Sequence, residues 1–500
     1  MIKLKPRTRI ILLSVISILI VVTIVLGVTY SFMQANIDSS SVTEVSLSSC
    51  AKITLSDTEA SIDLSNTSPI SKNRALETTP YTFTVTSSCE SYVGFNLYLA
   101  TLNTNTLVDS SIHYIITSQG SKDILAEGIL SEATNALSEF TAEEQTQLNN
   151  GIKGTFGTIY RIYNDSIPLQ GSVSYDLYLY IDSDVIDAST MGKTFNAGIA
   201  VKSYDREATF AEYLTTEVYT GTDGDNGLYY HDGQGTYGTL EAGDNSYRFA
   251  GADPNNYVCF GSDEETCPAD NLYRIIGVFD GQVKLIKHDY AGESTLGTAQ
   301  HGSTPPSSSY YKGSLSSIPY YRWGGSGSND SNTWSSSTFN TDILNGTYLN
   351  ILGSEWTSKI ATTIWKVGGI TTSQRSTPPK SVYNYEVGSS SSSTTYSAKI
   401  GLMYVSEYGY AASPENWSTA LINYGSDTNR NNNWMYMGAY EWTISRRSDS
   451  TDSAFLVDGD GGVYNSFVSA DRGVRPSFYL ESSVVLSGGS GTSADPYRIA

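Results

Sequence analysis

The segment 434–480 reads WMYMGAYEWTISRRSDSTDSAFLVDGDGGVYNSFVSADRGVRPSFYL and carries the strongest fold signals in the chain. Its apolar residues 454–457 precede the Asp- and Gly-rich segment 458–462 and the pair 463–464. This pattern is typical of two antiparallel strands joined by a tight turn. A further strand is expected over 473–480, where the proline fits only at the beginning of a strand or at a sheet edge. We therefore predict a small, turn-rich sheet near the C-terminus.

This arrangement resembles the C-terminal end of C-type lectin-like domains of the formylglycine-generating-enzyme type. The matching elements are the strand Glu441-Trp442-Thr443, the segment Ser445-Arg446-Arg447-Ser448, the hairpin over 454–464 and the closing Gly473-Val474-Arg475-Pro476. The pattern is also similar to ligand-binding proteins that retroelements diversify in bacteria and phages, and to uncharacterised surface proteins of gut Firmicutes with an N-terminal anchor and a β-rich spacer. The resemblance covers residues 228–500 and implies an α+β C-type lectin-like, ligand-binding domain there.

The resemblance also implies where a ligand binds. In the diversified binders, polar and aromatic side chains on the last strands and loops form the ligand surface, and the ligand expected here is an extracellular glycan or protein. The positions that match by location are Asn431, Asn432, Asn433, Tyr436, Ser448, Asp449, Asp452, Asp458, Asp460, Tyr464 and Asn465.

Several of these positions also have a purely structural interpretation. Asn431–Asn433 fit a loop with left-handed backbone, and Asp458 and Asp460 fit turn-forming residues. Tyr436 and Tyr464 are the better binding candidates, because a rigid ring with a polar tip gives contact area at a low cost in conformational entropy.

The tryptophans and arginines of this segment are expected to support the fold. Trp434 and Trp442 are predicted in the core, since large aromatic side chains dominate core burial. Three arginines either bind an acidic ligand or brace loops by pairing with Asp449 or Asp471, and we favour the second role: Arg446, Arg447 and Arg475.

Catalysis is not expected. Enzymes of the resembling family use cysteine chemistry near the C-terminal end of the domain, whereas no Cys follows Cys267. Calcium-dependent sugar lectins carry a Trp-Asn-Asp motif, which this chain lacks. It also lacks the HExxH, GxSxG and phosphate-loop motifs. We predict a binding protein with no cofactor and no metal, and keep a hydrolase assembled from distant residues as an alternative.

Residues 44–205 show the period-two alternation of half-buried strands, which predicts an antiparallel β-sandwich that serves as a stalk. Thr141 and Glu144 form a capping box that predicts one short helix ending near Gly151. Residues 206–227, which end in the Gly-, Asp- and Thr-rich stretch 220–227, are expected to form a linker, and a helix is expected over 338–352. The alternating segments are 81–86, 93–99, 173–181 and 195–201.

The four cysteines favour two local disulfides, Cys50–Cys89 and Cys259–Cys267, although four cysteines allow three connectivities. Disulfides are typical of exported proteins. Structural zinc is the rival interpretation, but the chain has no CxxC spacing and its four histidines are scattered.

The N-terminus predicts export. Four cations within residues 1–9 precede an apolar run over 10–28, which as a helix spans about 28 Å, close to the ~30 Å hydrocarbon core of a bilayer. We expect a transmembrane signal anchor over 10–33, with residues 1–9 in the cytoplasm and the rest outside the cell. A cleaved signal peptide is the alternative.

The charge balance argues against nucleic-acid partners, because 51 Asp and Glu against 30 Lys and Arg give a net charge of −21. Together these features predict a mostly β, membrane-anchored adhesin that displays a lectin-like head. The alternative is a structural subunit of a surface fibre or coat, built through exposed strand edges.

Overall fold

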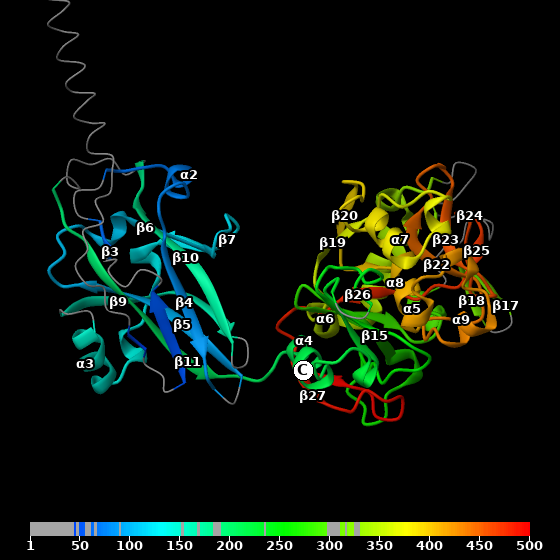
Figure 1. The fold of residues 1–500 in the computed structure, drawn as a ribbon, viewed down its shortest axis with the longest axis horizontal. Coiled ribbons are helices and arrows are strands. Elements are labelled where there is room, and N and C mark those ends of the chain that lie inside the picture. The colour runs from blue at the N-terminus through cyan, green and yellow to red at the C-terminus, as the bar shows by residue number, and fades with distance from the viewer. Residues whose placement is uncertain are drawn as a thin grey trace, which may run out of the picture. The chain divides into compact units, whose positions relative to one another are not determined.

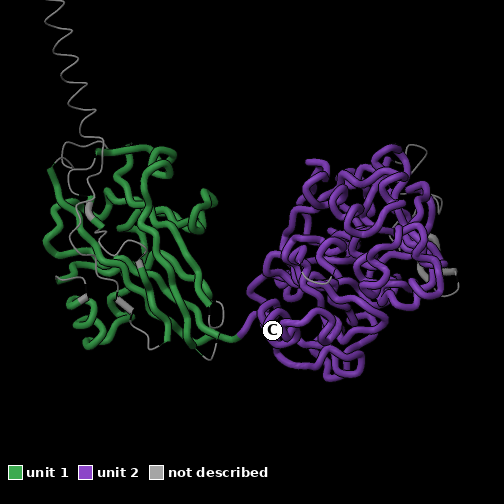
Figure 2. Tube along the Cα trace, in the orientation of Figure 1, with its two compact units in different colours: residues 1–207 green, residues 208–500 purple. Residues whose placement is uncertain are grey.

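The computed structural model divides into two compact units, residues 1–207 and 208–500 (Figure 2). It is mostly β, with predominantly antiparallel sheets, as the sequence predicts (Figure 1). The predicted cytoplasmic segment 1–9 and anchor 10–33 lie outside the residues that the structure describes. Among those that it does describe, no helix combines the length and apolar character that crossing a membrane requires. The described residues are 45–46, 50–55, 62–64, 68–89, 92–151, 155–167, 171–183, 192–234, 237–297, 311–315, 318–324 and 331–500.

Unit 1 contains two sheets. The first has the order β1-β11-β5-β9-β8, with β3 also on β11; β1 pairs parallel with β11, and the other neighbours are antiparallel. Its strands are β1 Val45–Ser46, β3 Ile62–Asp63, β5 Val93–Leu102, β8 Thr134–Asn135, β9 Phe156–Ile167 and β11 Asn196–Asp205. The second sheet is antiparallel, in the order β2-β4-β10-β6-β7. Its strands are β2 Ala51–Leu55, β4 Tyr81–Ser87, β6 Ile112–Ser118, β7 Ile124–Ile129 and β10 Ser172–Ile181.

The two sheets of unit 1 share one apolar core. In β4, Phe83 and Val85 are buried while Thr82, Thr84 and Thr86 are not, which is the alternation that the sequence shows. Phe95 of the first sheet meets Tyr175 of the second at a ring-centroid distance of 5.9 Å. The sheets therefore face each other across this core.

Short helices complete unit 1. The predicted capping box is confirmed, because Glu144 N donates to Thr141 Oγ1 at 3.2 Å and Thr141 N donates to Glu144 Oε2 at 2.7 Å. The helices are α2 Lys72–Ala75, η1 Asp109–Ser111, η2 Leu130–Glu132, η3 Leu137–Glu139 and α3 Ala142–Gly151.

Unit 2 is built around a sheet in the order β12-β13-β15-β16-β26-β21, with β14 also on β15. The Asp280-Gly281 turn joins β15 to β16, and Asp280 adopts the left-handed conformation that such a turn requires (φ 48°). The strands are β12 Leu228–His231, β13 Ser246–Phe249, β14 Tyr257–Cys259, β15 Leu272–Phe279, β16 Gln282–Lys287, β21 Ile400–Gly401 and β26 Ser477–Tyr479.

Smaller sheets surround this central sheet. The predicted hairpin over 454–464 is confirmed as β23–β24, and the strand predicted over 473–480 is the shorter β26, which begins directly after Pro476. The small-sheet strands are β17 Tyr311–Leu315, β18 Ile318–Arg322, β19 Thr363–Lys366, β20 Thr395–Ala398, β22 Glu441–Arg446, β23 Ser453–Val457, β24 Val463–Phe467, β25 Asp471–Arg472, β27 Leu486–Gly488 and β28 Arg498–Ile499.

The helices of unit 2 are short. The helix expected over 338–352 is two consecutive segments, η11 and α6. η11 is a π-helix, and its wider turns change the direction in which the residues of the following α6 point. Phe339 and Ile343 of η11 are therefore buried, whereas Ile351 of α6 is 48% exposed. The helices are α4 Phe210–Tyr213, η6 Leu214–Val218, η7 Asp225–Gly227, η8 Ala269–Asn271, α5 Glu293–Leu296, η10 Trp334–Ser336, η11 Phe339–Tyr348, α6 Leu349–Ser358, η12 Gln374–Ser376, α7 Pro379–Glu386, α8 Val405–Tyr410, η13 Pro414–Asn416, η14 Leu421–Asn423 and α9 Asp427–Asn431.

The prediction of a linker over 206–227 is wrong for most of that segment. The unit boundary lies at 207/208, and the helices α4 and η6 bury Phe210, Leu214 and Val218 in the core of unit 2. Phe210 N also donates to Val484 O at 2.7 Å. Since this segment is tied to the C-terminal part of the chain, it belongs to the second unit.

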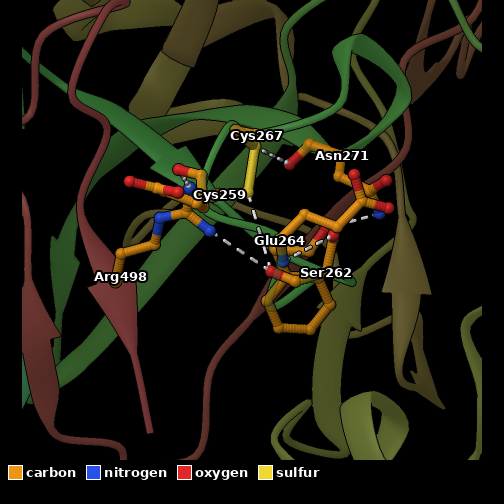
Figure 3. Close-up of a disulfide and its surroundings, with 8 residues drawn as sticks. Cys259, Ser262, Glu264, Cys267, Asn271 and Arg498 are labelled. Atoms are coloured by element: carbon orange, nitrogen blue, oxygen red, sulfur yellow. Dashed lines mark hydrogen bonds between the residues drawn. A yellow bond between two sulfur atoms is a disulfide. The ribbon is translucent and has the colours of Figure 1, made fainter.

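Both predicted disulfides are confirmed, Cys50–Cys89 in unit 1 and Cys259–Cys267 in unit 2. Arg498 and Asn271 lie on either side of the second disulfide (Figure 3). Arg498 Nη2 donates to Glu265 O at 2.8 Å, so the loop that this disulfide closes is also held to the last strand, β28.

Candidate functional site

The asparagines after α9 are mainly structural. Asn433 is buried: its Nδ2 donates to Tyr408 O at 2.9 Å and its Oδ1 accepts from Met435 N at 3.0 Å. Asn432 Nδ2 donates to Thr428 O and has φ −104°, and none of Asn431–Asn433 adopts the left-handed backbone considered above. Asn431 alone is exposed. The ligand role implied for Asn433 is therefore wrong, because both polar ends of its amide are used inside the fold.

The 458–462 turn brings another group of predicted residues together. Asp458 Oδ1 accepts from Asp460 N and from Gly462 N, both at 2.9 Å, so Asp458 is a turn-forming residue. Tyr436 Oη donates to Gly459 O at 2.6 Å and is half-buried, which ties its hydroxyl to the same turn. Asp460 projects outward, with its side chain 86% exposed. Of this group, Asp460 is the residue free to meet a ligand.

The loop 447–452 carries the next predicted residues. Arg447 Nε donates to Asp449 Oδ1 at 2.8 Å, the pairing that the sequence favoured, and this hydrogen bond lowers the pKa of Asp449. Asp452 accepts from the hydroxyls of Ser450 and Ser453, which lower its pKa. Both carboxylates are therefore ionised at neutral pH. Asp449 is exposed together with Ser448, while Asp452 is directed to its own loop.

The other two arginines of the predicted segment, Arg475 and Arg446, have different kinds of partner. Arg475 is fully buried and pairs with Glu441, with Nε to Oε1 at 2.7 Å, rather than with an aspartate. Arg446 Nε donates to Gly368 O. Trp434 and Trp442 are buried, as predicted, and their indole N–H groups donate to Phe249 O and Tyr321 O.

Strand β24 presents Tyr464, which is 41% exposed, and the half-buried Asn465. The guanidinium of Arg375 lies 4.9 Å from the centre of the Tyr464 ring, and its Nη1 donates to Val463 O at 2.6 Å. The sequence analysis missed Arg375, which lies outside the segment that carries the resemblance. No local pattern around it indicates a position under an exposed tyrosine.

A chain of contacts joins these segments. Ser448 N donates to Ile370 O at 2.7 Å, which places the loop 447–452 beside the residues that lead to Arg375. Arg375 holds Tyr464, and at the other end of the hairpin Asp460 lies 3.8 Å from Arg430 of α9. We call five exposed or partly exposed side chains, together with the buried Arg375 that supports Tyr464, the recognition strip: Arg375, Arg430, Ser448, Asp449, Asp460 and Tyr464.

A second feature of unit 2 is a cavity of about 280 Å³ that no predicted site residue lines. We call it the Arg248 pocket. Its lining comes from segments between residues 244 and 479, so no sequence motif marks it. The lining residues are Asp244, Ser246, Arg248, Phe279, Asp280, Ile364, Lys366, Tyr383, Val387, Tyr404, Ser406, Glu407 and Tyr479.

Two buried ion pairs lie at this pocket. Arg248 Nη2 donates to Asp244 Oδ2 at 2.6 Å, and Lys284 Nζ donates to Glu407 Oε1 at 2.5 Å. Burial raises the pKa of Asp244, but the Arg248 guanidinium outweighs this effect and holds that pKa well below its usual range. Burial lowers the pKa of Lys284, and Glu407 offsets part of that change. The charges of these pairs are therefore fixed in place and mutually compensated.

A metal role finds no support in the geometry: across the described part of the chain, His, Cys, Asp and Glu side chains do not gather in threes that could hold an ion. Comparison with known proteins matches the chain to no family model, no curated protein and no solved structure.

Proposed function

We propose that this protein is a cell-surface binding protein, an adhesin that recognises an extracellular glycan or protein through unit 2. In this proposal residues 10–33 anchor the chain in the membrane, unit 1 is a spacer, and unit 2 is a C-type lectin-like head. The protein acts by binding rather than by catalysis.

The recognition strip is the observation that carries the proposal. Segments around residues 375, 430, 448 and 464 are distant in sequence, yet hydrogen bonds and stacking join them. An exposed tyrosine stacked on an arginine is held in one orientation, so a ligand that contacts it does not have to order it first. The exposed carboxylates of Asp449 and Asp460 supply hydrogen-bond acceptors, which suit hydroxyl and amide donors of a glycan or a protein.

The disulfides support the extracellular part of the proposal. Each unit holds one disulfide, and such bonds persist in oxidising compartments. The scaffold also fits recognition, because the strip lies on loops, on the short helices η12 and α9 and on β24, which a buried framework positions.

The test is binding of the full chain, in lipid nanodiscs, to an array of glycans and extracellular matrix proteins. The site variant is Asp449→Ala/Tyr464→Ala. A matched control is Tyr204→Ala, because Tyr204 in unit 1 is exposed by the same 41% as Tyr464. Binding that the control retains and the site variant loses, with both folded, supports the proposal. Binding that both variants retain, or none by the parent protein, contradicts it.

A second candidate function, a subunit of a surface fibre or coat, rests on the edge strand β7. There Ile124 and Leu125 are 37% and 44% exposed, on a strand that pairs with β6 on one side in the described sheet. Apolar edge strands are templates for pairing with another chain. Filaments seen by electron microscopy with the full chain, and lost in Leu125→Lys, would favour this function over adhesion.

A further inference from the structure

We infer that the Arg248 pocket is a binding site for one neutral, polyhydroxylated ring, a single sugar residue. This site is separate from the recognition strip, and the inference does not rest on the function proposed for that strip. It follows from the size of the pocket, from its compensated charges and from the polar atoms that the fold leaves without a partner.

The size of the pocket limits the ligand. At ~30 Å³ for each water molecule, a cavity of about 280 Å³ holds about nine waters. One sugar ring with its substituents, about a dozen non-hydrogen atoms, fits such a space, which lies near the lower end of the roughly 300–1,000 Å³ typical of pockets for drug-sized ligands.

The charges of the pocket argue for a neutral ligand. Arg248 is paired with Asp244. Lys284 is paired with the lining residue Glu407 and compensates the charge of its carboxylate. Lys366 and the exposed Asp280 add one charge of each sign to the lining. A free anion or cation would therefore meet both signs of charge. The titratable groups that face or underlie the pocket are Asp244, Arg248, Asp280, Lys284, Lys366, Tyr383, Glu386, Tyr404, Glu407 and Tyr479.

The pocket offers hydrogen-bonding atoms with no protein partner. Arg248 is buried and uses Nε on Ser246 and Nη2 on Asp244, while its Nη1 makes no hydrogen bond to the described residues. The hydroxyl of Tyr479 likewise has no partner in the described part of the chain, although its ring lines the pocket. The carboxylate of Glu407 accepts one hydrogen bond on each oxygen and so retains acceptor capacity. Fixed donors and acceptors at one site match the hydroxyl groups of a sugar.

Aromatic rings supply the rest of the recognition. The Arg248 guanidinium lies 4.6 Å from the centre of Phe279 and 5.4 Å from that of Tyr383, which holds it in a rigid frame. Lys284 Nζ lies 4.7 Å from the Tyr404 ring and 5.0 Å from the Tyr479 ring. Because protein cations already cover these rings, an added cation gains little from them. The apolar surface of these rings offers van der Waals contact to the C–H groups of a sugar.

The experiment uses the full chain in lipid nanodiscs, which avoids detergents with sugar headgroups. Free hexoses and N-acetylhexosamines at millimolar concentration are tested by saturation-transfer NMR and titration. Acetate, ethylammonium and glycine serve as charged probes. We expect at least one sugar to bind and the charged probes not to bind. Binding of charged probes alone, or of no probe, would overturn the inference.

Matched variants locate the binding. Ile364→Trp replaces an aliphatic side chain by a bulky indole ring at the mouth of the pocket, where Ile364 is 70% exposed. This change should abolish sugar binding. Ile351→Trp makes the same change at a site 48% exposed and outside the pocket, and should leave binding unchanged. Tyr479→Phe removes one hydroxyl and should weaken binding about fivefold, the effect of one hydrogen bond. Sugar binding that survives Ile364→Trp but is lost in Tyr464→Ala would overturn the pocket as the site.

Discussion

The two units bury their polar groups in opposite ways. Among the described residues of unit 1, Asp176 is the one charged residue in the buried class, and the core is a set of alternating apolar side chains from two sheets. Unit 2 buries many charges, several of which, such as Lys284 and Arg475, pair with a carboxylate far away in sequence. The buried charged residues are Glu241, Arg248, Arg274, Lys284, Lys287, Arg375, Glu386, Glu407, Glu441 and Arg475.

The difference supports placing the proposed site in unit 2. A sandwich of regular strands needs only period-two patterning to be stable, which suits a spacer. Buried charges cost stability unless they are paired, and they pre-position donors and acceptors. Under the proposed function, this difference favours unit 2 as the recognition unit, because the recognition strip and the Arg248 pocket both lie on its framework of compensated charges.

The largest effect is expected from breaking a buried ion pair of unit 2. Glu441→Ala leaves Arg475, which is 0% exposed, without its carboxylate, and should lower the free energy of unfolding by about 3–5 kcal/mol. Glu127→Ala in unit 1 breaks an exposed pair with Lys72 and should cost at most about 1 kcal/mol. Denaturant unfolding of the full chain measures both. Equal losses would mean that the two units do not differ in this respect.

For the disulfides the expected order of the two units is the opposite, with the larger loss of stability in unit 1. Cys50–Cys89 closes a sequence separation of 39 residues and Cys259–Cys267 one of 8. Loop-closure entropy then gives about 4 kcal/mol for the first and about 2.6 kcal/mol for the second. Replacing each pair by alanines should therefore destabilise unit 1 more than unit 2, as measured by thermal unfolding under non-reducing conditions. A greater loss in unit 2 would contradict this ranking.

A smaller effect is expected from pH. Burial, together with the nearby Asp223 and Asp232, raises the pKa of Glu241 from 4.5 to about 7, against the opposing effect of a hydrogen bond from Gly233 N. Because the folded pKa is above the unfolded one, the folded protein binds the proton more tightly. The stability from this group is complete below pH 4.5 and is lost as the pH rises to about 7.

Glu241→Gln should reduce this dependence. Between pH 5 and pH 7.5 the Tm of the parent protein should fall by more than that of the variant, because glutamine does not titrate. The exposed Glu355→Gln is the control and should behave as the parent. A Tm difference between parent and Glu241→Gln that stays constant with pH would refute the assignment.

The smallest stability change is expected in the recognition strip. Tyr464→Ala removes an exposed ring stacked on Arg375 and should cost about 0.5–1 kcal/mol. Calorimetry of the full chain checks this value. A loss of several kcal/mol would show that Tyr464 is part of the core framework and that its exposure is incidental.

Local patterns predicted unit 1 and the hairpins well for a physical reason. Phe83 and Val85 alternate with threonines because each strand has one buried face, and this information is contained in neighbouring residues. The segment 206–227 also contains a helical pattern, which the linker prediction overlooked because it was based on the glycines and aspartates of 220–227. Phe210, Leu214 and Val218 are spaced by four, which is one face of a helix.

The candidate sites could be predicted only in part. Tyr464 and Asp460 are exposed where the resemblance placed them, but Asn433 is a buried hydrogen-bonding residue. Arg248 and Glu407 meet at the pocket across more than a hundred residues. Charged residues are ordinarily expected at the surface, so no single-sequence pattern brings these two together.

The most direct test of the claim that unit 2 is the recognition unit is a comparison of Tyr464→Ala with Tyr204→Ala. Both tyrosines are 41% exposed, one in each unit. The measurement is binding of the full chain, in nanodiscs, to the glycan and matrix-protein array. We predict that Tyr464→Ala weakens binding and that Tyr204→Ala leaves it at the level of the parent. Loss of binding in Tyr204→Ala with retention in Tyr464→Ala would contradict the claim and assign recognition to unit 1.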